Sequence, residues 1–327
     1  MFALQNIISL GSNFAKKSIL NKVFILSEVN CPDKIYKRYT LTSGSPVQLQ
    51  LSYQYFAESL TSENTIPIIV LHGLLGSKAN WNSVCRALAK ENLRTIIAVD
   101  ARNHGDSPHV YDFSYESMVS DIVYFLKKHN IEKASFIGHS MGGRTVMLLA
   151  QLYPEMVHSM AIVDISPVGE SPNMVEMSEL LRKIKKLDLK EDLTLAEARK
   201  KATEKLTKLE LEPKLINFLL TNLADNEPVS NWRWKFNIRA IAENFETEIC
   251  RFPILRTDVN TRTLFISGMN SDYIRPQDEP RIRKIFPRSH FQYIVGAGHW
   301  VHADRPQAFI QTVSGFFKEE KPSFSVP

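Results

Sequence analysis

The pentapeptide 138–142, Gly-His-Ser-Met-Gly, constrains the fold of this chain more than any other feature, because it matches the pattern G-x-S-x-G. The apolar run 134–137 before it suits a buried strand, and the run 144–153 after it suits a helix that Pro154 ends. A serine held between a strand and a helix, with a glycine two residues away on each side, is typical of a nucleophile elbow. We therefore predict that Ser140 is a nucleophile. The alternative is a glycine-rich turn without chemistry.

Apolar runs and helical patterns alternate on both sides of this turn. Buried strands are predicted at 66–71, 95–99, 160–163, 263–267 and 290–295, and helices at 81–90, 115–129 and 306–317. The segment 47–55 alternates apolar and polar residues, with Tyr53 and Tyr55 on the apolar side, as in a half-buried antiparallel edge strand. This alternation predicts right-handed β-α-β units and a mostly parallel sheet flanked by helices.

The alternation stops between residues 169 and 254, where helical patterns rich in Lys and Glu replace it. Helices are predicted there at 180–186, 195–209 and 213–223. We interpret 169–254 as a helical cap inserted into a core made of residues 29–168 and 255–320. Its large apolar side chains are expected to form the core of the cap and, in part, an acyl pocket above Ser140; they are Phe218, Leu219, Trp232, Trp234, Phe236 and Phe245.

The first 27 residues contain three lysines and no acidic residue, and their apolar positions fall near one helical face. This composition is typical of a mitochondrial transit peptide, so we predict that residues 1–28 direct import into the matrix. Removing these lysines lowers the net charge from +5 to +2 (5 − 3), which does not argue for a nucleic-acid partner. No run approaches the ~18 apolar residues of a membrane span. The cysteines, Cys31, Cys85 and Cys250, predict neither a disulfide framework nor a zinc site.

Acyl transfer at a serine needs a base, an acid that orients the base, and backbone N–H donors that bind the oxyanion. Around a nucleophile elbow the usual chain order is Ser, then Asp or Glu, then His. His299 follows the last predicted strand in a glycine-rich turn, so we predict it as the base. His302 is expected to be structural. We predict the N–H groups of Met141 and Leu74 as the oxyanion donors, with Leu75 in reserve, because the second donor comes from the loop after an earlier strand.

Two residues are candidates for the orienting acid. Asp272 follows the predicted strand 263–267, where the acid usually lies, but the usual slot is one residue earlier and holds Ser271. Asp164 ends the strand that follows the nucleophile helix. A carboxylate at the end of an apolar strand needs a partner, because burying an unpaired charge is costly, and His299 could be that partner. The residues by themselves leave both candidates open.

These features resemble the α/β-hydrolase superfamily over most of the chain, and least in the inserted segment. The resemblance extends to a subgroup that includes a mitochondrial animal hydrolase, bacterial esterases and fungal ethanol acetyltransferases, and the matching stretches are 100–107, 138–143, 163–167 and 298–306. It implies the α/β-hydrolase fold with an inserted helical cap, and it places the acid on Asp164. A serine at position 271 is typical of those esterases. The acid proposed in the cap of some animal members has no counterpart, because the matching stretch 236–241 holds Arg239.

The resemblance implies a mitochondrial serine hydrolase that cleaves carboxylic esters of acylglycerols such as diacylglycerol. No metal or organic cofactor is implied, and the 2-oxoglutarate dehydrogenase complex is implied as a candidate partner. Two alternatives remain open. One is an acyltransferase, in which an alcohol replaces water. The other is a catalytically dispensable binding protein of that complex, which would be expected to lack a member of the triad.

Overall fold

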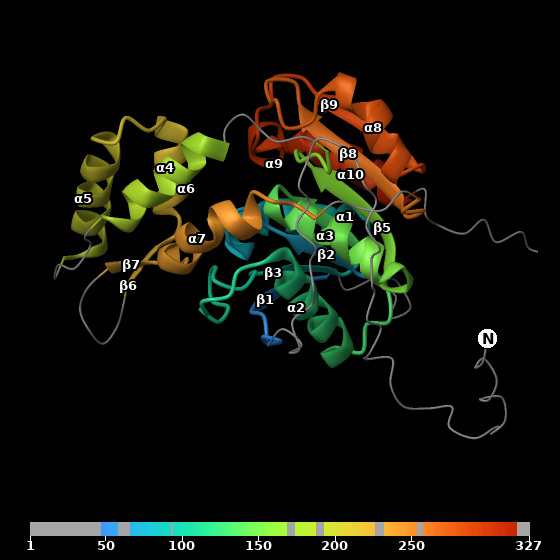
Figure 1. The fold of residues 1–327 in the computed structure, drawn as a ribbon, viewed down its shortest axis with the longest axis horizontal. Helices are drawn as coiled ribbons and strands as arrows, with labels where there is room; N and C mark the ends of the chain where they lie inside the picture. Colours follow the sequence, from blue (N-terminus) through green and yellow to red (C-terminus); the bar gives the residue numbers. More distant parts are fainter. Residues whose placement is uncertain are drawn as a thin grey trace, which may run out of the picture. The chain divides into compact units, whose positions relative to one another are not determined.

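The protein is built around one seven-stranded sheet, seen in the computed structural model in the order β1-β3-β2-β4-β5-β8-β9 (Figure 1). Every neighbouring pair is parallel except β1 with β3. The strands are β1 (Tyr53–Phe56), β2 (Ile68–Leu71), β3 (Ile96–Val99), β4 (Ala134–His139), β5 (Val157–Val163), β8 (Arg262–Gly268) and β9 (Ser289–Ile294). This confirms the predicted mostly parallel sheet.

The structure describes residues 47–57, 66–92, 94–168, 174–187, 193–225, 232–253 and 258–318, all within one compact unit that spans residues 46–327. The predicted transit segment, residues 1–28, lies outside the described residues. None of the described helices is long and apolar enough to cross a membrane.

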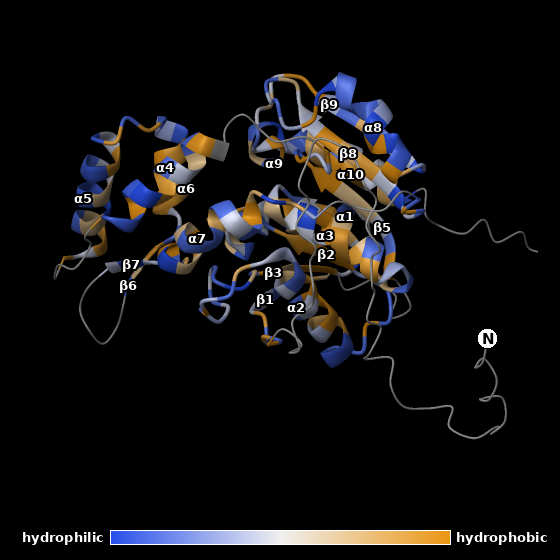
Figure 2. Ribbon diagram, in the orientation of Figure 1, coloured by the Kyte–Doolittle hydropathy of each residue, from blue (hydrophilic) through white to orange (hydrophobic). Residues whose placement is uncertain are grey.

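Helices cover both faces of the sheet, as the continuous apolar runs of its inner strands require. In β2, Ile69 and Leu71 pack with helices α2 (Tyr115–Lys128) and α3 (Met141–Leu152). The intervening residues Ile68 and Val70 pack on the other face. There they meet helices α1 (Asn82–Asn92) and α10 (Pro306–Lys318). Figure 2 shows the result, with apolar strands at the centre and polar stretches on the outer helices.

The edge strand β1 differs from its prediction. It begins only at Tyr53, and Tyr53 and Tyr55 are 40% and 58% exposed, whereas Phe56 is buried. Tyr53 instead lies against Phe125 and His129 at the end of α2, with its ring centroid 5.3 and 4.8 Å from theirs. The predicted inward side of this strand is therefore wrong for the two tyrosines. An edge strand with one partner leaves room for amphipathic rings at its rim.

The segment between β5 and β8 is helical, as predicted. It contains α4 (Met174–Lys185), α5 (Leu195–Thr207), α6 (Pro213–Leu220), α7 (Ile238–Asn244) and a π-helical turn over Phe245–Ile249. It also contains an antiparallel pair that the sequence did not indicate, β6 (Leu223–Asp225) with β7 (Trp232–Trp234). Strands of three residues are too short to show a period-2 pattern. The helices α8 (Glu279–Ile285) and α9 (Val301–Asp304) were not predicted either, because they are too short to show a clear helical periodicity.

Candidate active site

Ser140 occupies a strained turn between β4 and α3. Its φ of 52° and ψ of −116° lie in a region that residues with a side chain rarely adopt. The turn requires glycine on both sides. A Cβ on Gly138 would lie 2.6 Å from the carbonyl oxygen of Gly142, and one on Gly142 would lie 2.6 Å from that of Leu71. The strand, turn and helix that the pentapeptide predicted are all present, with Ser140 directly before the first helical residue.

His299 is bonded to Asp164. Its Nδ1 lies 2.7 Å from Oδ2 of the carboxylate, which is fully buried at the end of β5. Because a carboxylate accepts, Nδ1 carries a proton, which leaves Nε2 as the ring nitrogen that can accept one. The structure thus brings together the histidine predicted as base and one of the two candidate acids, although 135 residues separate them in the chain.

Three further donors hold the Asp164 carboxylate. The Ser267 hydroxyl and the Gly268 N–H donate to Oδ1 at 2.7 and 3.2 Å. The Ser271 hydroxyl donates to Oδ2 at 2.5 Å. A buried carboxylate needs such partners, because burying an unpaired charge costs on the order of several kcal/mol of folding free energy. Asp164 is thereby fixed from β8 and its following loop as well as from His299.

Asp272, the other candidate acid, forms no hydrogen bond or ion pair with His299 in the part of the chain that the structure describes. The loop turns so that its two neighbours face the site. Ser271 donates to Asp164, and the Tyr273 ring stacks on the His299 ring, with centroids 4.1 Å apart and planes 22° apart. The one-residue offset noticed in the sequence therefore matches a real difference in orientation.

A second histidine, His139, holds the backbone of His299. His139 donates from Nε2 to the carbonyl oxygen of His299 at 2.9 Å, and the ring centroids lie 4.8 Å apart. Burial lowers the pKa of His139 well below its usual range, so it stays neutral in this role. His302 is also buried, and burial lowers its pKa to about 3. It stacks on Trp81 with centroids 4.0 Å apart, as expected of a structural histidine.

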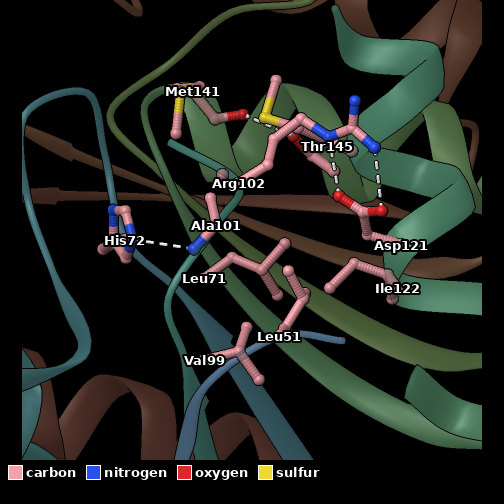
Figure 3. A pocket seen from close by; sticks show the side chains of 12 residues that line it. Leu51, Leu71, His72, Val99, Ala101, Arg102, Asp121, Ile122, Met141 and Thr145 are labelled. Atoms are coloured by element: carbon pink, nitrogen blue, oxygen red, sulfur yellow. Dashed lines mark hydrogen bonds and ion pairs between the residues drawn. The ribbon is translucent and has the colours of Figure 1, made fainter. Parts of the chain in front are cut away.

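Two buried histidines shape the loop after β2. His72 accepts the Ala101 N–H at Nε2, 3.0 Å away (Figure 3), and donates from Nδ1 to the Gly73 carbonyl oxygen at 2.8 Å. His104 accepts the Leu75 N–H at 3.1 Å. Burial lowers the pKa of both rings, which keeps their acceptor nitrogens free of protons. The loop reaches the serine, since a Cβ on Gly73 would lie 3.2 Å from that of Ser140.

This arrangement separates the two candidate donors in the loop. The N–H of Leu75, the reserve candidate, is already bonded to His104 Nε2 and is therefore not available to an oxyanion in this structure. The N–H groups of Leu74 and Met141 meet no acceptor within the described residues. They are the two that remain available to a ligand.

A small cavity lies beside the elbow, and Met141 and Gly142 are among the residues that line it. Figure 3 shows it between Leu71, Met141 and Thr145, beside the buried ion pair of Arg102 with Asp121 at 2.7 Å. Its volume of about 10 Å³ holds at most one water molecule. Neither Ser140 nor His299 lines it, so this cavity does not include the candidate nucleophile or the candidate base. Among the described residues, no group of His, Cys, Asp or Glu could hold a metal ion.

The inserted segment touches the loop that carries His299. Lys214 at the start of α6 forms an ion pair with Asp304, and the other oxygen of that carboxylate accepts the Gly298 N–H at 2.8 Å. The Phe218 ring lies 5.4 Å from that of Trp300, the residue after His299. Asp304 follows His299 in the chain, whereas the orienting acid precedes the histidine in the usual chain order.

The large apolar side chains of the insertion belong to one hydrophobic cluster that also contains residues of the sheet core. Leu219, Trp234, Phe236 and Phe245 are buried. Phe218 and Trp232 are only partly buried and pack against the same core. Of this set, Phe218 has a ring contact with a neighbour of His299.

The sequence matches the family model of the alpha/beta hydrolase fold over residues 66–306. A mouse (Mus musculus) protein named sn-1-specific diacylglycerol lipase ABHD11 is 40% identical over 269 residues, which cover 82% of this chain and 85% of the mouse protein. Esterase YbfF of Escherichia coli is 32% identical, and the match covers 78% of this chain and 94% of the esterase. Ethanol acetyltransferase 1 of Hanseniaspora uvarum is 29% identical and covers 77% of this chain and 79% of its own.

A solved structure supports the same conclusion. A marine microorganism esterase superposes with a TM-score of 0.73 at 37% identity, and the match covers 82% of this chain and 100% of the esterase. From these matches, the chain belongs to the α/β-hydrolase fold family.

Proposed function

We propose that this protein is a serine hydrolase that cleaves carboxylic esters of lipids, with diacylglycerol as a substrate. The observation that carries the proposal is the His299–Asp164 hydrogen bond of 2.7 Å, formed beside a strained serine turn. The substrate class follows the mouse relative, which is named a diacylglycerol lipase, and the reaction class follows the relatives named esterases.

In the proposed mechanism, Ser140 Oγ attacks the ester carbonyl while His299 accepts its proton at Nε2. The imidazolium then donates that proton to the departing alcohol oxygen, which leaves an acyl group on Ser140. A water molecule, deprotonated by His299, attacks the acyl-enzyme, and the imidazolium returns that proton to Ser140 Oγ as the bond to the acyl group breaks and the fatty acid leaves. Asp164 keeps the proton of the neutral ring on Nδ1 and stabilises the positive charge that His299 carries in both steps.

The oxyanion of each tetrahedral intermediate is assigned to the N–H groups of Leu74 and Met141. Both are free of other acceptors within the described residues, and Met141 also opens α3, whose amino end favours negative charge. One such donor contributes roughly 3 kcal/mol to transition-state stabilisation. The loop that presents Leu74 is already fixed by His72 and His104, so the site needs little reorganisation when charge develops.

Acyl transfer to an alcohol uses the same acyl-enzyme and differs only in the final acceptor. Acyl transfer is the second candidate reaction, because one relative of this chain is named an ethanol acetyltransferase. A binding protein without activity would not need a strained serine turn, because strain of this kind costs of order 1–3 kcal/mol. We therefore favour an enzyme.

We further propose that the inserted helices, within residues 169–254, form a cap over the site. The support is the contact of α6 with the His299 loop, through Lys214 with Asp304 and Phe218 with Trp300. An apolar side chain at this position offers a surface for an acyl chain, since ligand sites are largely lined by apolar groups.

The proposal includes a location in the mitochondrial matrix, supported by the acid-free first 27 residues. Association with the 2-oxoglutarate dehydrogenase complex is the partner that the family resemblance suggests.

The first prediction concerns the nucleophile. Ser140→Ala should abolish labelling by a fluorophosphonate probe and the hydrolysis of diacylglycerol, because no other group is proposed to attack the carbonyl. Intact-mass analysis of the labelled protein measures the first, and release of fatty acid measures the second. Adding ethanol to the wild-type assay separates the two enzyme readings, because an acyltransferase forms an ethyl ester. Full labelling of the Ser140→Ala variant would refute the mechanism.

The second prediction distinguishes the two acids. Asp164→Asn should lower kcat about 10⁴-fold at neutral pH, as in the serine protease template, because an amide at this position favours the wrong tautomer of His299. Asp272→Asn is the matched control and should change kcat less than about threefold, since it removes no bond to His299 and surface polar changes stay within about 0.5 kcal/mol. Both variants are compared by thermal unfolding before assay. The reverse ranking would show that Asp272 is the acid.

The third prediction tests the cap. Phe218→Ala should lower kcat/KM for a long-chain ester about tenfold more than for an acetate ester, because only the long chain reaches the lost apolar surface, at ~0.8 kcal/mol per buried methylene. Leu195→Ala, at an exposed residue of α5, serves as the control and should affect neither ester. An equal loss for both esters from Phe218→Ala would argue against an acyl site beneath α6.

The fourth prediction concerns import and partner. The full-length chain with a carboxyl-terminal tag should fractionate with the mitochondrial matrix, whereas a variant with acidic replacements at Lys16, Lys17 and Lys22 should not, because import signals of this type are basic. Immunoprecipitation of the matrix form is expected to recover subunits of the dehydrogenase complex. Matrix delivery of the acidic variant would contradict the assignment of the segment.

A further inference from the structure

The imidazole of His299 has an aromatic ring lying flat against it. The Tyr273 ring centroid is 4.1 Å from that of His299, and the planes are 22° apart. The Trp300 ring, the next aromatic neighbour along the chain, lies 6.1 Å away and is tilted by 60°. Of these two rings, only Tyr273 presents its face to the imidazole.

From this geometry we propose that Tyr273 is a positioning residue that stabilises the positively charged form of His299 through the face of its ring. The inference rests on the proposed function, in which His299 gains a proton each time Ser140 attacks. An aromatic face carries partial negative charge and attracts a cation within about 6 Å of its centroid. A neutral imidazole gains little from this attraction, whereas the imidazolium that forms in the transition state of the proposed mechanism gains more. An interaction of that kind raises kcat.

The charged and titratable groups around His299 leave this role to Tyr273. Asp164 contacts the edge of the ring at Nδ1 and its carboxylate is shared with Ser267 and Ser271. His139 and His302 approach from β4 and α9, and burial lowers the pKa of both, so neither brings charge.

The more distant charges are paired with each other. Lys214 and Asp304 form an ion pair beyond Trp300, with the Lys214 ammonium 5.4 Å from the Trp300 ring centroid. Asp272 lies between Ser271 and Tyr273 and interacts electrostatically with Arg275.

The same loop controls the acid and the stack. The Ser271 hydroxyl donates to Asp164 and accepts the Tyr273 N–H at 3.4 Å. One backbone conformation therefore sets the hydrogen bond at the edge of the imidazole and the aromatic contact on its face. This explains how a residue outside the triad can be held in a fixed stack.

The test compares Tyr273→Phe, which keeps the ring, with Tyr273→Leu, which keeps apolar cover but removes the aromatic face. The readouts are kcat and the pH profile of kcat/KM for an activated ester, with Tyr111→Leu, at an exposed tyrosine, as the control. A cation–π contribution of the usual size predicts that Tyr273→Leu lowers kcat about 2–5-fold and moves the midpoint of the acid limb down by about 0.5 pH unit. The midpoint moves down because the variant stabilises the protonated form of His299 less, so that a lower pH is needed to protonate the ring. Tyr273→Phe keeps the ring face and should keep the midpoint of the acid limb at the wild-type value, and the control should match the wild type in both readouts.

A fall in kcat for Tyr273→Leu with an unchanged acid limb would overturn the proposal, because a steric role alone moves no titration. So would a Tyr273→Phe variant as impaired as Tyr273→Leu, which would assign the effect to the hydroxyl. If Tyr273→Leu does not fold, fluorinated phenylalanines at position 273 replace it, and the midpoint should fall stepwise as the ring face becomes less negative. Fluorophosphonate labelling of Ser140 in wild-type protein is measured in parallel, because its absence refutes the proposed function itself.

Discussion

The candidate site depends on one buried contact, the hydrogen bond between His299 and Asp164. Asp164 directly follows β5 and is fully buried. Its backbone has a φ of 52°, a conformation that aspartate tolerates better than most residues. Leaving a buried acceptor such as the Asp164 carboxylate without one of its donors typically costs about 1–3 kcal/mol. Three elements must therefore be in place together: β5 to carry the acid, β8 to supply Ser267 and Gly268, and the turn after β9 to present the base.

The rest of the site is arranged around this contact by small, buried and neutral groups. His139 fixes the His299 backbone, and His72 and His104 fix the loop of Leu74. Each of these rings is buried, and burial keeps each in the neutral form that can both donate and accept. A charged ring at any of the three positions would lose its acceptor nitrogen. The site is thus organised by hydrogen bonds whose direction is set by burial.

Much of this could be predicted from the sequence, because local constraints are visible in it. The glycines on both sides of Ser140 mark positions of the turn where no side chain fits. The continuous apolar runs mark strands that are covered on both faces. Other features could not be predicted because they arise between distant residues. The bond of Leu75 to His104 spans 29 positions, and the choice of Asp164 over Asp272 as the partner of His299 depends on how the loop after β8 turns. The Tyr273 stack has no sequence pattern at all.

The most direct measurement of the central claim is a crystal structure of the enzyme inhibited with a phosphonate, whose tetrahedral phosphorus imitates the first intermediate. The account predicts phosphorus bonded to Ser140 Oγ, one phosphonyl oxygen within hydrogen-bonding distance of the Leu74 and Met141 N–H groups, and His299 still bonded through Nδ1 to Asp164. An adduct on another residue, or a His299 ring turned away from Asp164 toward Asp272, would contradict it.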